Sequence, residues 1–210
     1  MAFFLVEGFK HTSNIKKYLG RIFLFAVISQ IPYLWAYRAP SIIYPLNIMF
    51  TLFLGLLMIY LHEQMESRGG FWFLFVVFLL VSFAMEWSLV GIIMILMYKV
   101  IQDEKKRRFW PPALAFFVNG GLGLLLMGLA ALVNSLGDIP ELAEFYELGF
   151  EFTVSAMSLT LFFGLGSLLA TFFLRNYNGE RGKSMKYLFY VIYPLHFVVL
   201  GVLALVLNID

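Results

Sequence analysis

The positive charges of this chain fall almost entirely into alternate gaps between its apolar segments. When the segments are threaded through a membrane in order, fourteen of the fifteen Lys and Arg residues lie on one side, and only Arg38 lies on the other. Loops rich in Lys and Arg resist translocation and stay in the cytoplasm. The pattern predicts a multi-pass protein of the cytoplasmic (inner) membrane, with the acidic, cation-free stretch 138–151 on the outer side.

Most of the predicted spans approach the roughly 20 residues that cross a hydrocarbon core. They are Ile22–Tyr37, Ile42–Leu61, Phe71–Met85, Trp87–Tyr98, Ala113–Asn134, Phe152–Leu174 and Tyr187–Leu207. The stretch 71–98 could also be one long helix, but that threading would move most of the cations outside. Two short helices are therefore predicted, joined by an external turn at Glu86, Trp87 and Ser88. Pro111 and Pro112 mark the start of the next span.

The composition agrees with this reading, because 61% of the residues are hydrophobic and 13% are charged, against roughly 25% charged in an ordinary soluble domain. The predicted fold class is all-α, a polytopic transmembrane helical bundle of seven spans plus an N-terminal half helix, with residues 1–210 as a single domain. The absence of Cys excludes disulfides and thiolate metal sites. No metal-ligand spacing is present. The basic residues are expected to face membrane lipid rather than nucleic acid.

Polar side chains within the predicted spans carry the functional signal, because they are costly in hydrocarbon unless they face the bundle interior or a wet cavity. His196 lies about ten residues beyond Lys186, which places it ~15 Å deep at 1.5 Å per residue. Pro194 cannot donate to the carbonyl of Tyr190 and should kink the helix beside Tyr193. The alternative is a neutral histidine that simply bonds to a neighbouring helix.

A second polar group gathers at the cytoplasmic end of the first two segments. Glu7 and His11 are four residues apart and share a helical face, and Thr12 and Arg21 follow. Histidine exchanges protons near neutral pH, and arginine can hold a phosphate. The alternative for Lys17 and the neighbouring lysines is attraction to anionic lipid headgroups.

Three amides lie in or near the predicted spans. Gln30, Asn47 and Asn119 can either bond helices to one another or line a cavity. Glu86 reads as a solvated residue of the external turn, and His62 reads as a surface residue beside Glu63.

Read in order, these segments resemble the TraX family. The resemblance rests on FLVEGFKHTSN at 4–14, KYL at 17–19 with Arg21, FA at 25–26, ISQIP at 28–32, LN and FTL within 46–52, Glu86 with Gly91, YNG and RG within 177–182, and KYLFY through YPLH at 186–196. It covers nearly the whole chain, and residues 101–171 add little to it.

The resemblance implies a membrane acyltransferase, similar to the enzymes that O-acetylate cell-surface sugars, that draws its acetyl group from cytosolic acetyl-CoA. Seven residues match polar positions of the family's motifs, namely Glu7, His11, Arg21, Gln30, Asn47, Tyr193 and His196. Family members usually begin with a further helix that contains an Asp-His pair. Because Met1–Phe9 covers only about half of the ~30 Å core, we expect an in-frame upstream extension of roughly 30 to 45 residues.

The predicted function is transfer of an acetyl group to a membrane or extracytoplasmic acceptor, either an amine of a pilin-like protein or a hydroxyl of a cell-surface glycan. His196 is expected to act as a general base that Tyr193 orients, and Glu7 is expected to orient His11. Arg21 and Lys17, or the basic segment 105–108, are expected to hold CoA phosphates. Gln30 and Asn47 are expected to contact substrate.

Two other function classes are open. A transporter or flippase would show paired, interrupted helices in two related halves, and the sequence shows no such symmetry. A structural membrane subunit predicts that alanine at Glu7, Arg21 or His196 changes stability alone. Turnover of acetyl-CoA in proteoliposomes separates the acetyltransferase from both.

Overall fold

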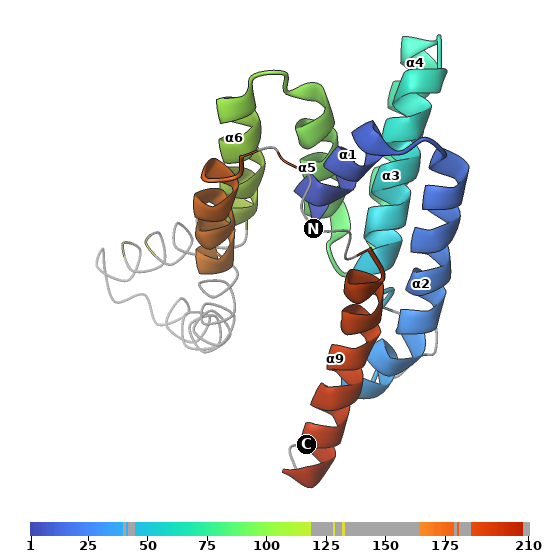
Figure 1. Cartoon of the computed structure of the whole chain (residues 1–210), viewed down its shortest axis with the longest axis vertical. Coiled ribbons are helices and arrows are strands. Elements are labelled where there is room, and N and C mark those ends of the chain that lie inside the picture. The colour runs from blue at the N-terminus through green and yellow to red at the C-terminus, as the bar shows by residue number, and fades with distance from the viewer. Residues whose placement is uncertain are drawn as a thin grey trace. The chain divides into compact units, whose positions relative to one another are not determined.

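The computed structural model describes residues 1–39, 41, 45–118, 128, 132, 164–178, 180 and 186–207, and these residues form helices and no strand. The all-α fold class is therefore confirmed. The helices with described bounds are α1 Ala2–His11, α2 Ile15–Ala36, α3 Ile48–Gln64, α4 Arg68–Ser82, α5 Ser88–Val100, α6 Glu104–Phe116, an unlabelled helix Gly164–Arg175, and α9 Lys186–Val206 (Figure 1).

The chain divides into two compact units. One contains the described residues of Met1–Val100 and Gly179–Asp210, and the other contains those of Ile101–Asn178. The single domain expected from the sequence stays a prediction.

Polar side chains fix where the helices begin. Asn14 caps α2 by accepting from the Lys17 N–H, and Asp103 caps α6 by accepting from the Lys106 N–H. Ser67 accepts from the Gly70 N–H at the start of α4, at 3.1 Å. Such caps satisfy amide groups of the first turn that have no partner within the helix.

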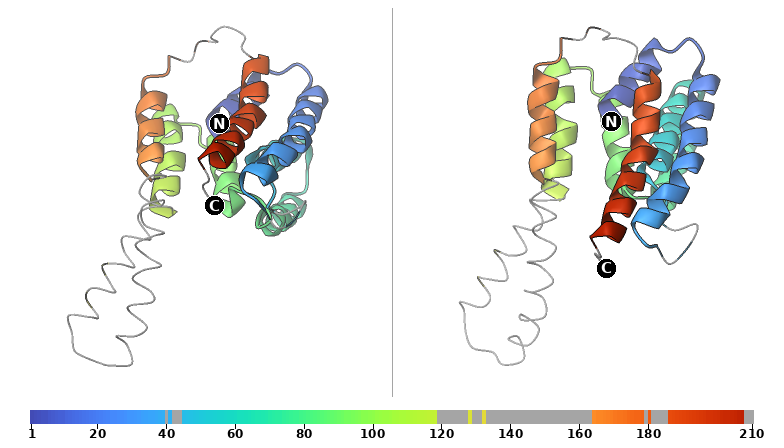
Figure 2. Two further views of the ribbon diagram at one scale, coloured as in Figure 1. Left: turned by 90° about the horizontal axis from the view of Figure 1, so that it is seen from below. Right: turned by 60° about the horizontal axis from the view of Figure 1, so that its bottom comes forward.

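In the first unit, α2 and α9 run parallel and side by side (Figures 1 and 2). The rings of Phe25 and Tyr190 stack with centroids 4.6 Å apart, and two turns further on the rings of Tyr33 and Phe197 meet edge-on at 5.2 Å. The offset between partners changes by only one residue between the two pairs, so the two helices advance nearly in register.

The turns of this unit gather at two ends. At one end the backbone of Leu46 pairs with the α4–α5 turn, through Leu46 N–H to Ala84 O and Glu86 N–H to Leu46 O, both at 2.9 Å. At the other end Lys99 of α5 forms an ion pair with Glu63 of α3. The predicted break near Glu86 is confirmed, because α4 ends at Ser82 and α5 begins at Ser88. This alternation of ends is what the predicted threading requires.

The number of predicted spans is not confirmed. Among the described residues, only α2 is both long enough and apolar enough to cross a membrane, and the other apolar helices are shorter. The helix expected to start at Ile42 starts at Ile48 instead, because Asn47 caps it and Leu46 pairs with the α4–α5 turn. Asn119 and most of the fifth and sixth predicted spans lie outside the described residues.

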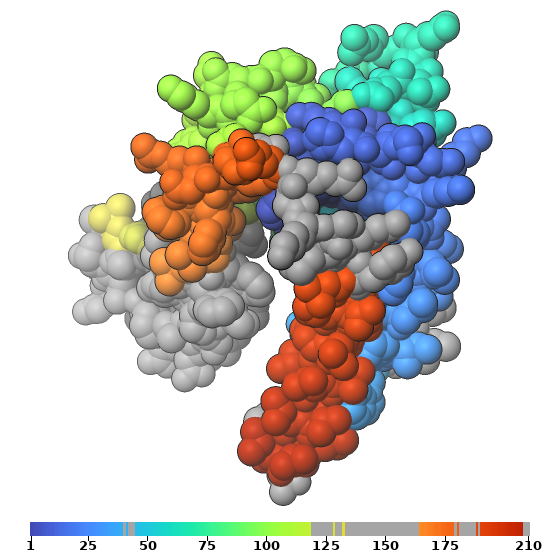
Figure 3. Space-filling view, viewed as in Figure 1, coloured from blue at the N-terminus to red at the C-terminus, as the bar shows by residue number. Residues whose placement is uncertain are grey.

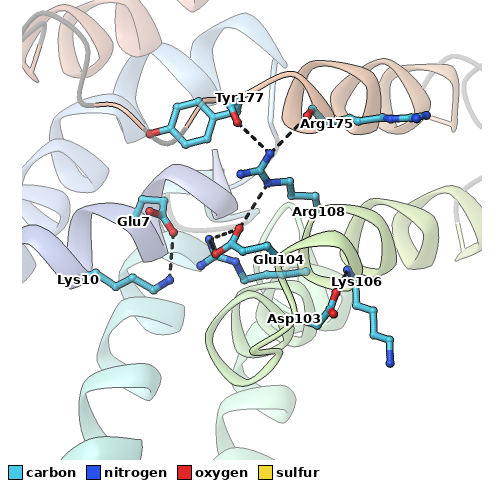
Figure 4. Close-up of polar contacts among 9 residues, drawn as sticks. Glu7, Lys10, Asp103, Glu104, Lys106, Arg108, Arg175 and Tyr177 are labelled. Carbon is cyan, nitrogen blue, oxygen red and sulfur yellow. Dashed lines mark hydrogen bonds and ion pairs between the residues drawn. The ribbon is translucent and has the colours of Figure 1, made fainter.

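In the second unit, the segment expected to be a basic loop is helical. α6 begins at Glu104, so Pro111 and Pro112 lie inside the helix and do not mark its start. The Asp103 cap explains the earlier start. Figure 4 shows that Arg108 donates from Nη1 to the carbonyl oxygens of Tyr177, at 2.8 Å, and Arg175, at 3.3 Å. Both carbonyls lie at the C-terminal end of the helix Gly164–Arg175, where a cation is favourable.

Small residues allow close contact between α3 and α5. A Cβ atom at Gly91 would lie 2.7 Å from Thr51 Cγ2 and 2.9 Å from Trp87 Cβ, neither of which is the end of a flexible side chain. Gly55 of α3 faces Ile95 of α5 in the same way. Glycine at these positions lets the two backbones approach.

The substitutions Gly91→Ala and Gly20→Ala should therefore change stability in opposite directions. Overpacking at Gly91 costs ~1–3 kcal/mol, more than the ~1 kcal/mol gained in helix propensity. Gly20 has no atom within 4 Å of its added Cβ, so the alanine there gains propensity alone. Thermal unfolding in detergent measures both, and a Gly91→Ala protein as stable as Gly20→Ala would contradict the close packing.

Candidate functional site

A buried amide pair joins α2 to the start of α3. Asn47 is fully buried and Gln30 nearly so. Asn47 Nδ2 donates to Gln30 Oε1 and to Ala26 O, both at 2.8 Å, and its backbone N–H donates to Gln30 Oε1 at 3.1 Å. Gln30 Nε2 in turn donates to Pro45 O at 2.9 Å. The two amides therefore bind protein groups and hold the α2–α3 connection against α2.

Glu86 extends this network from the α4–α5 turn. Its Oε2 accepts from the Ile48 N–H at 3.1 Å, beside the Asn47 cap at the start of α3. Although Glu86 is an exposed residue, loss of solvent around its carboxylate raises the pKa of the group, while the Ile48 N–H and His196 act in the opposite direction. The carboxylate thus binds the start of α3 while the residue still reaches the surface.

An aromatic cluster from α2 and α9 lies beside this network. The Tyr193 ring is 5.3 Å from the His196 ring and 5.2 Å from the Phe197 ring, and the Tyr37 ring is 6.0 Å from Phe197. Tyr33 and Tyr193 are buried, and His196 is half-buried. The cluster has few polar atoms apart from the Tyr hydroxyls and the imidazole.

The contact of His196 fixes which of its ring nitrogens carries the proton. Nδ1 lies 3.3 Å from the carbonyl oxygen of Ile192, one turn earlier in α9. A carbonyl oxygen only accepts, so in the neutral ring this contact requires the proton on Nδ1. The lone pair then lies on Nε2, which is the arrangement that a general base needs.

Three buried hydroxyls from three helices have no hydrogen-bond partner among the described residues. They are Ser29 Oγ of α2, Thr51 Oγ1 of α3 and Tyr193 Oη of α9. The α2–α9 register places Ser29 level with Tyr193. A buried hydroxyl without a partner costs ~1–3 kcal/mol. Water or a polar ligand bound between these helices would remove that cost.

The remaining predicted site residues lie near the other end of the unit. Glu7 forms an ion pair with Lys10 at 3.3 Å, and His11 is exposed at the end of α1. Lys17 is also exposed. The Arg21 guanidinium lies 5.7 Å from the centre of the Tyr18 ring, and its Nε is buried with no hydrogen-bond partner among the described residues. Of these residues, Arg21 is the one with a buried side-chain nitrogen that has no hydrogen-bond partner among the described residues.

An open depression of about 370 Å³ lies at the same end of the unit. Its lining includes Phe9, Lys10, Ser13, Tyr60, Gln64 and Lys99. The Lys99 ammonium lies 4.8 Å from the centre of the Phe9 ring, so a cation and an aromatic face meet at this surface.

The structure thus brings Gln30, Asn47, Tyr193 and His196 to one end of the unit, and it leaves Glu7, His11, Lys17 and Arg21 toward the other end. The amides are hydrogen-bonded to protein, and their role toward substrate stays a prediction. No group of carboxylates and histidines suited to a metal ion occurs among the described residues.

The sequence predicts Glu86 as a solvated turn residue and does not predict its hydrogen bond to the start of α3. The available signal was that Glu86 is the sole charged residue between Phe71 and Tyr98. Its contact with Ile48 depends on the pairing of two turns that are distant in the sequence, which no local pattern reveals.

One protein family and one curated protein match this chain in sequence. The model of the family described as "TraX protein" matches residues 1–204. The "Probable fimbrial assembly protein FimC, serogroup H1" of Dichelobacter nodosus is 28% identical over 213 residues, which cover 95% of this chain and 76% of the relative. No solved structure matches the chain.

If the buried amide network holds the turns, Asn47→Leu should lower the free energy of unfolding by ~2–4 kcal/mol, because it removes a cap and two side-chain donations. Asn14→Ala is the matched control. It removes an exposed N-cap that accepts one bond, from Lys17 N–H at 2.9 Å, and should cost ~1 kcal/mol. Equal losses in the two variants, measured by thermal or denaturant unfolding in detergent, would show that the network contributes nothing beyond a cap.

Proposed function

The chain belongs to the TraX family, and from that premise we propose that it is a membrane acetyltransferase that uses cytosolic acetyl-CoA. The observation that carries the proposal is the family match over residues 1–204. The family is membrane-associated. The relative that is named for fimbrial assembly supports a pilus-related role, such as conjugation, with a pilin-like protein as one possible acceptor and a cell-surface glycan as the other.

The exposed surface supports a location in the bilayer. Large apolar side chains cover the outer faces of α2, α4 and α9, with exposed fractions of 77% for Ile31, 70% for Phe73 and 71% for Val206. Figure 3 shows α9 lying open along one face of its unit. Apolar patches beyond a few hundred Å² are rare on soluble monomers. Together with the charge pattern, this surface supports a multi-pass protein of the cytoplasmic membrane.

Arg21 is suited to bind a phosphate group of acetyl-CoA. Its buried Nε has no partner among the described residues, and guanidinium groups bind phosphate through paired donors. The position on α2 that lies beside His196 of α9 is eleven residues beyond Arg21. This corresponds to ~16 Å along the helix at 1.5 Å per residue. The extended pantetheine arm of CoA can cover a distance of that order. Lys17, which is exposed, adds positive charge at the same end.

His196 is suited to accept the proton of the acceptor. The acceptor amine or hydroxyl attacks the thioester carbon, a new C–N or C–O bond forms, and the C–S bond breaks. The acceptor proton moves to His196 Nε2, and the CoA thiolate takes a proton from cytoplasmic water. Tyr193 packs against the imidazole and limits its rotation. This placement supports the general-base role.

In proteoliposomes supplied with radiolabelled acetyl-CoA, we expect His196→Gln to lower acetyl transfer by ~10²- to 10⁴-fold, the usual contribution of a general base. The acceptor probes are a synthetic peptide with a free N-terminal amine and a methyl hexoside with free hydroxyls. His62→Gln is the control, because His62 packs edge-on against Phe71 in another part of the unit. Wild-type protein that transfers acetyl to neither probe and releases no free thiol would contradict the proposed function.

Arg21→Ala should raise the KM for acetyl-CoA by ~10-fold or more and leave kcat nearly unchanged. It removes a charged hydrogen bond, worth ~1.5–3 kcal/mol, that is made equally in the ground and transition states. Arg68→Ala, at the exposed start of α4, should leave both constants unchanged. A fall in kcat without a change in KM would place Arg21 outside donor binding.

A further inference from the structure

The Tyr18 side chain contacts both α1 and the Arg21 guanidinium. The hydroxyl end of the ring meets α1 at Gly8, where an added Cβ atom would lie 2.8 Å from the hydroxyl oxygen and 3.3 Å from Cζ. The Arg21 guanidinium lies over the same ring, with Cζ 5.7 Å from the ring centre. Tyr18 and Arg21 are three residues apart on α2, a spacing that places side chains on one face of a helix. The ring therefore links the guanidinium to α1.

α1 is a firm support for this contact. Four of its side chains are buried, namely those of Ala2, Phe3, Leu5 and Val6. The Phe3 ring meets the Tyr98 ring of α5 edge-on, with centroids 5.5 Å apart. Only residues 12–14 join α1 to α2. Because buried side chains are closely packed and move little on average, Gly8 presents a fixed surface to the Tyr18 hydroxyl.

The contact also accounts for a glycine inside a helix. Gly8 lies within α1, where glycine is less favourable than alanine because it loses more backbone entropy on folding. The Tyr18 hydroxyl occupies the space that a Cβ atom at this position would need. A larger residue at position 8 would move the ring and, with it, the surface over which Arg21 lies.

An arginine binds a phosphate more tightly when its guanidinium is already held in place. The side chain has several rotatable bonds, and ordering them on binding costs free energy unless they are restricted beforehand. The attraction between the cation and the ring uses none of the N–H donors. Arg21 Nε has no hydrogen-bond partner among the described residues. A carboxylate in place of the ring would instead compete with the phosphate for those donors.

We propose that Tyr18, supported by Gly8, positions the Arg21 guanidinium for the phosphate groups of acetyl-CoA. This inference rests on the proposed function. Tyr18 acts through Arg21 and does not touch the donor, so it is a positioning residue. Gly8 in turn sets the place of the Tyr18 ring.

The first test needs no acetyl transfer. In protein that contains nitrogen-15 arginine, the Nε–H resonance of Arg21 is identified by its loss in Arg21→Lys. Tyr18→Leu removes the ring and should shift this resonance, whereas Tyr18→Phe keeps the ring and should leave it near its wild-type position. Gly20→Ala, with no atom within 4 Å of the added Cβ, should leave it unchanged. An Arg21 resonance that is the same in Tyr18→Leu as in the wild type would overturn the pairing.

The second test measures donor binding in turnover. In proteoliposomes with radiolabelled acetyl-CoA and the peptide amine, Tyr18→Leu should raise the KM for acetyl-CoA by ~3- to 10-fold, as expected for loss of a partly desolvated cation–π contact. The value of kcat should hardly change, because the contact is made in both the ground and transition states. Tyr18→Phe, which keeps the ring, should restore the wild-type KM. A fall in kcat with an unchanged KM would overturn the positioning role.

The third test concerns the support that Gly8 provides. Gly8→Ala should raise the KM for acetyl-CoA, because the added Cβ displaces the Tyr18 hydroxyl. In the double variant Gly8→Ala/Tyr18→Phe the hydroxyl is gone, so the KM should return to within ~2-fold of the wild-type value, the non-additivity expected of residues in contact. Gly20→Ala is the matched control and should leave the KM unchanged. An increase that persists in full in the double variant would show that the alanine acts through α1 alone and would overturn the role of Gly8.

The outcomes distinguish the inference from the proposed function. Wild-type protein that transfers acetyl to neither acceptor probe would overturn the proposed function, and the role of Tyr18 toward the donor with it. A raised KM in Arg21→Ala together with a wild-type KM in Tyr18→Leu would overturn the inference alone.

Discussion

Asn47 and Gln30 determine how the first unit can reverse direction within an apolar environment. Backbone amides and carbonyls that leave a helix must find partners, and in hydrocarbon each one that fails to do so costs several kcal/mol. In this unit the amide side chains bind Pro45 O, Ala26 O and the Asn47 N–H, and Glu86 binds the Ile48 N–H. The Pro45 carbonyl and the Asn47 and Ile48 amides, which lie just before and at the start of α3, find their partners in this way. The same network and the two backbone bonds of Leu46 hold the α4–α5 turn against the start of α3.

Much of the first unit could be predicted from the sequence, because apolar length and charge sidedness act locally. They predicted an all-α chain, the break near Glu86 and the alternation of ends. They could not predict that α3 starts at Ile48, because that start depends on Leu46 pairing with a turn almost forty residues away. They also misplaced the start of α6, where the Asp103 cap outweighs the two prolines. Apart from this local cap, the features that the sequence did not predict depend on the pairing of two distant segments.

The candidate site shows the same division. His196, Tyr193, Gln30 and Asn47 were each identified as costly polar groups, and the structure gathers them at one end. Glu86 was missed, since an acid in a turn normally faces water, and only the contact with Ile48 distinguishes it. Ser29 and Thr51 lie within the motifs that resemble the family, but their lack of partners was not predicted, because a hydroxyl in an apolar helix usually bonds to its own backbone. Their lack of partners is visible only once α2 and α3 are packed.

The parallel pairing of α2 with α9 also has a consequence for biogenesis. Two parallel helices cannot be joined by a short turn, and here residues 37–185 separate them. At ~5–20 residues per second, α2 leaves the ribosome roughly 8 to 30 seconds before its partner. During that interval the face of α2 that carries Phe25 and Tyr33 has no α9 to cover it. The C-terminal helix α9 is therefore the last to pack in this unit. A chain whose synthesis stops before α9 lacks His196.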